Sequence, residues 1–107
     1  MQLFEDLSGA EAAKKVAEGE LEVLDVRYEY EYHDHRIPKA TLIPLPQLHV
    51  RFHELDPHKP MLVVCEHGMR SLSACNFLGR QGFKKLYNLV GGMSVYPGLQ
   101  EGTGLKG

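Results

Sequence analysis

The sequence is poor in cysteine and has no long apolar run. Of its 107 residues, only Cys65 and Cys75 are cysteines. No apolar segment approaches the roughly 20 residues that a helix needs to span a bilayer. The first residues also lack the basic and apolar regions that mark a secretory signal. We therefore expect a cytoplasmic protein with free thiols and no membrane partner.

The sequence also lacks an excess of either charge. Twelve lysines and arginines stand against 14 aspartates and glutamates, which gives a formal net charge of -2. The basic residues are scattered along the chain and form no stripe on which a phosphate backbone could lie. We therefore expect no nucleic-acid partner.

The length and composition favour one compact domain. With 43% hydrophobic and 24% charged residues, the chain can bury one core but is too short for two ordinary domains. We assign residues 1–100 to this domain. Residues 101–107 contain three glycines and a single leucine that could pack, so we expect a flexible C-terminal tail.

Apolar segments alternate with helical patterns along the chain, which predicts an α/β fold. We expect a mostly parallel, five-stranded sheet with helices on both faces. Ser8 and Glu11 have the spacing of a capping box at the start of the first helix. The strands that the pattern locates are 21–26, 40–44, 61–64 and 85–89, and the helices are 10–18, 46–53 and 70–80, with shorter helical or looped segments at 28–34 and before Tyr96.

Cys65 stands where a buried strand gives way to a helix. The strand, Met61–Val64, consists of four successive apolar residues, which is typical of a strand covered on both faces. The first N–H groups of the helix that follows have no partners within it and carry the positive end of the helix dipole. A cysteine at such a position ionises readily, so we predict a nucleophilic thiolate.

The loop after Cys65 has the composition of an anion cradle. Successive N–H groups can curl toward the sulfur, and Gly68 can supply the positive φ angle that the curl requires. Arg70 adds a fixed charge that could hold an anionic substrate or brace the loop against an acidic neighbour. Asp25 and Arg27 lie at the carboxyl end of another predicted strand, so we expect them at the same edge of the sheet as Cys65.

Taken together, four segments resemble the rhodanese-like family of single-domain sulfurtransferases. The loop with glycine at its fourth place and arginine at its sixth is the most specific of them. The segments occur in the order seen in the family and span most of the chain: Leu24-Asp25-Val26-Arg27, Arg36-Ile37-Pro38-Lys39-Ala40, Cys65-Glu66-His67-Gly68-Met69-Arg70-Ser71 and Val90-Gly91-Gly92-Met93.

The resemblance implies that Cys65 takes a sulfane sulfur from thiosulfate or a persulfide and passes it on as a persulfide. The implied acceptors are cyanide, a small thiol or a protein cysteine. No metal, no organic cofactor and no more than a weak homodimer are expected. The implied substrate-binding residues are Glu66, His67, Gly68, Met69 and Arg70, whose backbone N–H groups would stabilise the persulfide, and the supporting residues are Asp25, Arg27 and Ser71.

Two other functions remain as alternatives. The first is a protein-binding or sulfur-relay module of the same fold with little turnover. The second is a Cdc25-like arsenate or disulfide reductase, which needs a second thiol near Cys65. Cys75 lies on the apolar face of the predicted helix, which favours core packing over a resolving role.

Glu66 leads to a hypothesis about the sulfur donor. A carboxylate beside the nucleophile repels anions, by about 1 kcal/mol or less for an exposed pair in water. We therefore expect dianionic thiosulfate to be a poorer donor than a persulfide of low charge.

Overall fold

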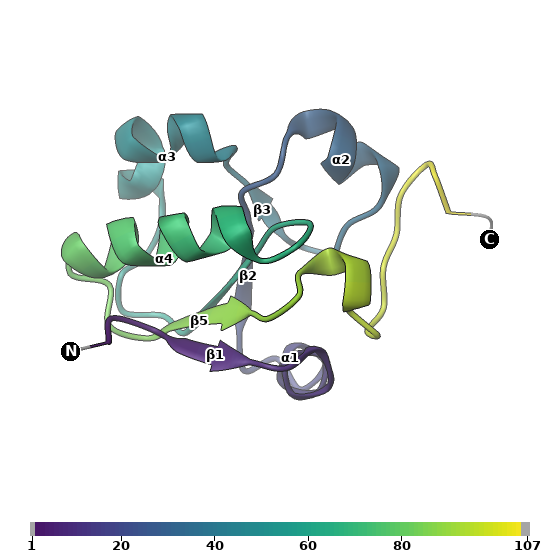
Figure 1. The fold of residues 1–107 in the computed structure, drawn as a ribbon, viewed down its shortest axis with the longest axis horizontal. Coiled ribbons are helices and arrows are strands. Elements are labelled where there is room, and N and C mark those ends of the chain that lie inside the picture. The colour runs from purple at the N-terminus through teal and green to yellow at the C-terminus, as the bar shows by residue number, and fades with distance from the viewer. Residues whose placement is uncertain (1, 106–107) are drawn as a thin grey trace.

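The structure is a computed structural model that describes residues 2–105. Its centre is a five-stranded sheet in the order β1-β5-β4-β2-β3, and every pair of neighbouring strands is parallel (Figure 1). The α/β fold with a parallel sheet is therefore confirmed. The strands are β1 (Glu5–Leu7), β2 (Glu22–Asp25), β3 (Thr41–Leu42), β4 (Met61–Val64) and β5 (Leu86–Leu89).

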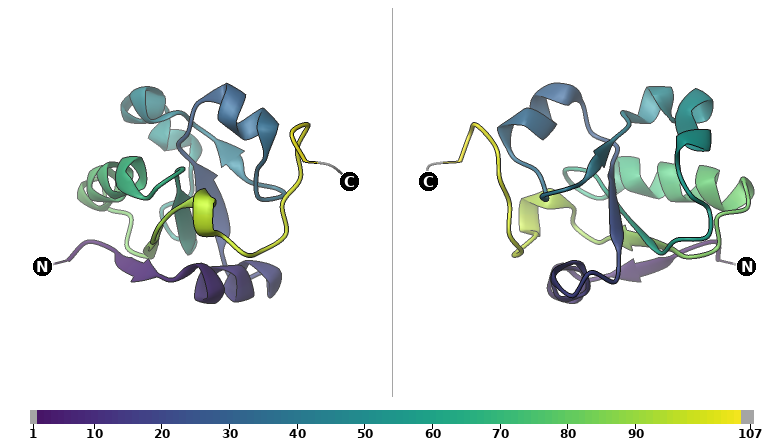
Figure 2. Two further views of the ribbon diagram at one scale, coloured as in Figure 1. Left: turned by 45° about the vertical axis from the view of Figure 1, so that its right-hand side comes forward. Right: turned by 180° about the vertical axis from the view of Figure 1, so that it is seen from behind.

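Helices cover both faces of the sheet, as the sequence predicts. In both views of Figure 2, α1 lies on one side of the sheet, and α3 and α4 lie on the other. The helices are α1 (Gly9–Ala17), α2 (Glu29–Asp34), α3 (Leu45–Arg51) and α4 (Met69–Arg80), and two short 3-10 turns follow α3 and β5 as η1 (Phe52–Glu54) and η2 (Met93–Val95).

Each face of the sheet has its own apolar core. Strand side chains alternate between faces, so successive residues of β4 enter different cores. Met61 and Val63 pack with α3 and α4, whereas Leu62 and Val64 pack on the side of α1. All four β4 side chains are buried, which holds this strand and the loop after it in the middle of the domain.

The predicted capping box at the start of α1 is confirmed. The N–H of Glu11 donates to Ser8 Oγ, and the N–H of Ser8 donates to a Glu11 carboxylate oxygen, each over 3.2 Å. Two of the N–H groups at the helix start thus gain partners. The cap fixes where the chain turns from β1 into α1.

The strand that the sequence pattern does not locate is β1. It has three residues, and only Leu7 is buried. Glu5 and Asp6 are exposed, as is common at a sheet edge, so no apolar alternation announces the strand. Its pairing with β5 is a tertiary contact across 82 residues, which puts Glu5 opposite Tyr87 and Asp6 opposite Asn88.

Residues after 100 form hydrogen bonds with the end of α2. Arg36 and Glu101 exchange two backbone hydrogen bonds of 2.8 and 2.9 Å, and the N–H groups of Thr103 and Gly104 donate to carbonyl groups of residues 33 and 34. The flexible tail expected for residues 101–107 stays a prediction, and its last two residues lie outside the described part of the chain.

Within residues 2–105, no helix has the length and apolarity that crossing a membrane would require.

Candidate functional site

Cys65 lies at the carboxyl end of β4, directly before the turn into α4. Its side chain is buried, with 1% of the residue exposed. The N–H of Gly68 points at Sγ over 3.1 Å, and the N–H of Ser71 does so over 3.2 Å. Of the loop N–H groups expected to face the sulfur, those of Glu66 to Arg70, only that of Gly68 donates to Sγ among the described residues, and the N–H of Ser71 is an additional donor. The side chain is also less exposed than its place in a loop implies. The reason is that the loop folds over the sulfur.

Gly68 allows this curl because it adopts the left-handed region, with φ of 93°. A side chain at this position would be strained by the backbone angle alone. The loop also lies against the segment after β5, where the N–H groups of Met93 and Ser94 donate to the carbonyl groups of Cys65 and Glu66. A β-carbon on Gly92 would come within 2.5 Å of the Cys65 carbonyl oxygen. Glycines 68 and 92 thus permit the two loops to pack together.

Arg70 braces the loop against an acidic neighbour. Its guanidinium forms two hydrogen bonds of 2.8 Å with the two carboxylate oxygens of Glu31 on α2. It also lies over the Tyr28 ring, 5.5 Å from the centroid. The Arg70 guanidinium is the main cause that lowers the pKa of the Glu31 carboxyl below its ordinary value. Of the two roles predicted for Arg70, the structure thus contains the brace.

Asp25 and Arg27 form a fully buried ion pair at the same edge of the sheet. Arg27 Nη2 donates to Asp25 Oδ2 over 2.8 Å and to the carbonyl of His35 over 2.6 Å. Burial lowers the pKa of the Arg27 guanidinium, but the hydrogen bonds to Asp25 and Glu66 outweigh it and raise the pKa above its ordinary value. The Arg27 guanidinium therefore remains charged, and its bonds to Asp25 and to the His35 carbonyl anchor the two ends of the segment that carries α2.

Glu66 connects this ion pair to the cysteine loop. Its carboxylate accepts a hydrogen bond of 3.1 Å from Arg27 Nη1, and its side chain is 24% exposed. His35 Nε2 lies 3.7 Å from the same carboxylate oxygen, and His35 Nδ1 lies 2.7 Å from Gln100 Oε1. The negative charge of Glu66 is thus partly balanced by Arg27, and its carboxylate is partly exposed beside Cys65.

The loop side chains of His67 and Met69 do not join this network. Both are exposed, Met69 to 71%, and neither forms a hydrogen bond with Sγ among the described residues. The structure therefore places them at the surface beside the loop, where a bound molecule could meet them.

Behind the sulfur lies a chain of polar groups that the sequence analysis misses except for Ser71. Cys65 Sγ lies 3.3 Å from Ser71 Oγ, which donates to Asn88 Oδ1 over 2.6 Å. Asn88 Nδ2 donates in turn to Asp6 Oδ1 over 3.1 Å. The available signal is Asn88 itself, a polar residue between Tyr87 and Leu89 in a buried strand.

Cys75 is a core residue, as predicted. It is fully buried on α4, and its burial raises the pKa of the thiol to about 12. A thiol that stays protonated in the core is unsuited to attack a disulfide.

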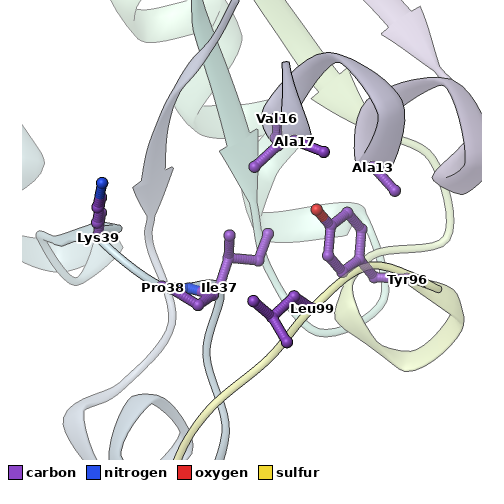
Figure 3. Close-up of a pocket in the computed structure, with 8 residues that line it drawn as sticks. All are labelled: Ala13, Val16, Ala17, Ile37, Pro38, Lys39, Tyr96 and Leu99. Carbon is purple, nitrogen blue, oxygen red and sulfur yellow. The ribbon is translucent and has the colours of Figure 1, made fainter. Parts of the chain in front are cut away.

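A cavity of about 330 Å³ lies between α1 and the segments around residues 38 and 98. Figure 3 shows the Tyr96 ring and Leu99 on one side of it and the α1 side chains on another. Cys65 and the residues of its loop are absent from the lining. This cavity is therefore separate from the candidate site. Among residues 2–105, no group of three or more His, Cys, Asp and Glu side chains is arranged to hold a metal ion.

Comparisons with known proteins agree with this geometry. The family model of the Rhodanese-like domain matches residues 8–97. The chain is 32% identical over 94 residues to the thiosulfate sulfurtransferase GlpE of Coxiella burnetii, and the match covers 88% of each protein. The crystal structure of a rhodanese-related protein from Thermoplasma volcanium has a TM-score of 0.85 and 25% identity, over 91% of this chain and 97% of the other. A NAD-dependent persulfide reductase from A. fulgidus is 36% identical with a TM-score of 0.68, over 85% of this chain and 15% of the other.

Proposed function

The chain belongs to the rhodanese-like domain family, and from this premise we propose that it is a sulfurtransferase in which Cys65 carries a sulfane sulfur as a persulfide. The proposal includes a small-molecule sulfur donor, a thiophilic acceptor and a cytoplasmic location. The donor is thiosulfate or a persulfide. The acceptor is cyanide, a small thiol or a cysteine of another protein.

The proposed reaction has two displacement steps at sulfur. In the first, the Cys65 thiolate attacks the outer sulfur of the donor, the sulfur–sulfur bond of the donor breaks, and the donor leaves as sulfite or as a thiolate. In the second, the acceptor attacks the outer sulfur of the Cys65 persulfide, and Cys65 leaves as a thiolate. Electrons balance without an external oxidant or reductant.

One observation carries the proposal: the N–H groups of Gly68 and Ser71 both point at Cys65 Sγ. Fixed donors of this kind stabilise negative charge on sulfur without reorganisation during the reaction.

The test is mass spectrometry of the intact protein after incubation with a sulfane donor. We expect the mass of one sulfur atom to be added and then lost on addition of a thiol. The Cys65→Ser variant should gain no sulfur. Cys75→Ser is the matched control and should gain it like the wild type, since Cys75 lies in the core. Sulfur uptake by Cys65→Ser would contradict the proposal.

A sulfur-relay module with little turnover is the second candidate. The named reductase from A. fulgidus favours it, because there a domain similar to this chain makes up a small part of a larger protein. A relay would form the same persulfide but pass it to a protein thiol much faster than to cyanide. The Cdc25-like reductase is not part of the proposal, since the pKa of Cys75 is raised by burial.

A further inference from the structure

The polar chain behind Cys65 has a defined hydrogen-bond direction. Asp6 is a carboxylate and can only accept, so the amide NH₂ of Asn88 must face it. The carbonyl oxygen of Asn88 then faces Ser71 and accepts a hydrogen bond of 2.6 Å from the Ser71 hydroxyl. The direction of each hydrogen bond thus follows from the one before it, starting from the exposed carboxylate of Asp6 at the sheet edge.

The direction of this chain determines what Ser71 offers to the sulfur. A serine hydroxyl has one proton, and in this arrangement the proton points at Asn88. Ser71 Oγ therefore presents a lone pair to Cys65 Sγ at 3.3 Å, and the S–H of the thiol donates to it. The hydroxyl of Ser71 thus favours the thiol form, whereas the N–H of the same residue favours the thiolate.

We propose that Asp6 and Asn88 are positioning residues that hold the Ser71 hydroxyl as an acceptor for the Cys65 thiol proton. They act through Ser71 and do not touch a substrate. The inference deepens the proposed function, because Cys65 is the nucleophile there. It implies that residues of β1 and β5, outside the cysteine loop, influence whether the Cys65 thiol keeps its proton.

The alternative hydroxyl orientation has a cost. When Cys65 loses its proton, the Ser71 hydroxyl could turn to donate to the thiolate. That would leave the carbonyl oxygen of Asn88 without a donor, in a residue that is 4% exposed. Unpaired buried acceptors are unfavourable. The amide bonds to the sulfur and the oriented hydroxyl therefore act in opposite directions on the thiol.

Other charges around the sulfur also act on its protonation. These groups include Asp6 on β1, Asp25 at the end of β2 and Arg27 after it, Glu31 on α2, Glu66 and His67 in the loop, and Arg70 and Cys75 on α4. The test must therefore separate the direction of the hydrogen bonds from the charge of Asp6.

Two substitutions at Asp6 make this separation. Asp6→Asn removes the charge but can still offer a carbonyl oxygen to Asn88, whereas Asp6→Ala removes both. The readout is the ultraviolet absorbance of the Cys65 thiolate against pH, taken as the difference from the same variant carrying Cys65→Ser. We expect the thiolate-to-thiol ratio at a given pH to be about three to ten times higher in Asp6→Ala than in Asp6→Asn, up to one unit on the pH axis. Equal titration of the two variants would overturn the proposal.

Ser71→Ala gives an independent sign test. If the hydroxyl accepts from the thiol, its removal raises the thiolate fraction at a given pH. A fall in that fraction would mean that Ser71 donates to the thiolate, which would also overturn the proposal. Both experiments read the protonation of one sulfur and need no sulfur donor. They can therefore fail while the persulfide still forms, or succeed where it does not.

Discussion

At the scale of single residues, the charges around Cys65 are already paired. Two guanidinium groups face three carboxylates, so the cluster has a net charge of one negative unit before His35 is counted; its members are Arg27, Arg70, Asp25, Glu31 and Glu66. Arg27 is fully buried, and the two terminal nitrogens of Arg70 are already bonded to Glu31. This arrangement supports the hypothesis, first drawn from Glu66 alone, that thiosulfate is a poorer donor than a persulfide of low charge.

The Glu66→Gln variant tests whether the charge of Glu66 disfavours thiosulfate as the donor. Glutamine keeps an oxygen that can accept from Arg27 Nη1, so the geometry of the rim is retained while one negative charge is lost. We expect kcat/KM for thiosulfate to rise about twofold to fivefold at low ionic strength and the gain to shrink as salt is added. The matched control is Glu54→Gln. It removes a carboxylate on η1 that is paired with Arg51 at the end of α3, away from the cysteine loop. A gain of equal size in the control, or none at Glu66, would count against the hypothesis.

At the scale of elements, the Glu31 and Arg70 contact ties α2 to the start of α4. The two helices belong to different parts of the chain, and α2 has no buried residue of its own. The bidentate pair is only partly exposed, which makes it stronger than an ordinary surface pair. The start of α4, which ends the cysteine loop, is therefore fixed to α2.

The pKa of Glu31 predicts how this tie responds to pH. Because hydrogen bonding to Arg70 lowers the pKa in the folded state, the stabilisation is present above the unfolded value of about 4.3 and is lost as the pH falls through the lower folded value. We expect Glu31→Gln to reduce the free energy of unfolding by about 1 kcal/mol at pH 7 and by much less in acid, measured by denaturant titration. The side-chain oxygen of glutamine can still accept the hydrogen bond that the N–H of Tyr28 donates to Glu31.

Glu29→Gln is the control for this experiment, since Glu29 lies on the same helix and its side chain is 77% exposed. It should change stability little at either pH. A loss in Glu31→Gln that persists unchanged in acid would show that the charge of Glu31 is not its cause.

At the scale of the whole molecule, the two cores share one sheet, so the domain should unfold in a single transition. The boundary at residue 100 can be tested by ending the chain there. This removes the four backbone hydrogen bonds that residues 101, 103 and 104 form with residues 33, 34 and 36, and the ion pair between Arg36 and Glu101. We expect one cooperative thermal transition and a loss of roughly 2–4 kcal/mol. Loss of cooperativity would mean that the last seven residues belong to the domain.

The sequence alone determined the alternation of strands and helices, the buried strand Met61–Val64, and the candidate nucleophile after it. These features are local: apolar runs, a capping box and a glycine in the loop reflect preferences of neighbouring residues. Such patterns predict four of the strands and three of the four helices, with differences at their ends, whereas for residues 28–34 they leave a short helix and a loop both open.

Only the tertiary structure decided which distant groups meet. β1 has no apolar pattern because it pairs at an edge, so Asp6 and Asn88 come together only when the sheet forms. The partner of Arg70 is likewise a glutamate 39 residues away, and nothing in the sequence distinguishes Glu31 from the other carboxylates as that partner. Contacts between elements depend on packing geometry, which the order of residues along the chain does not display.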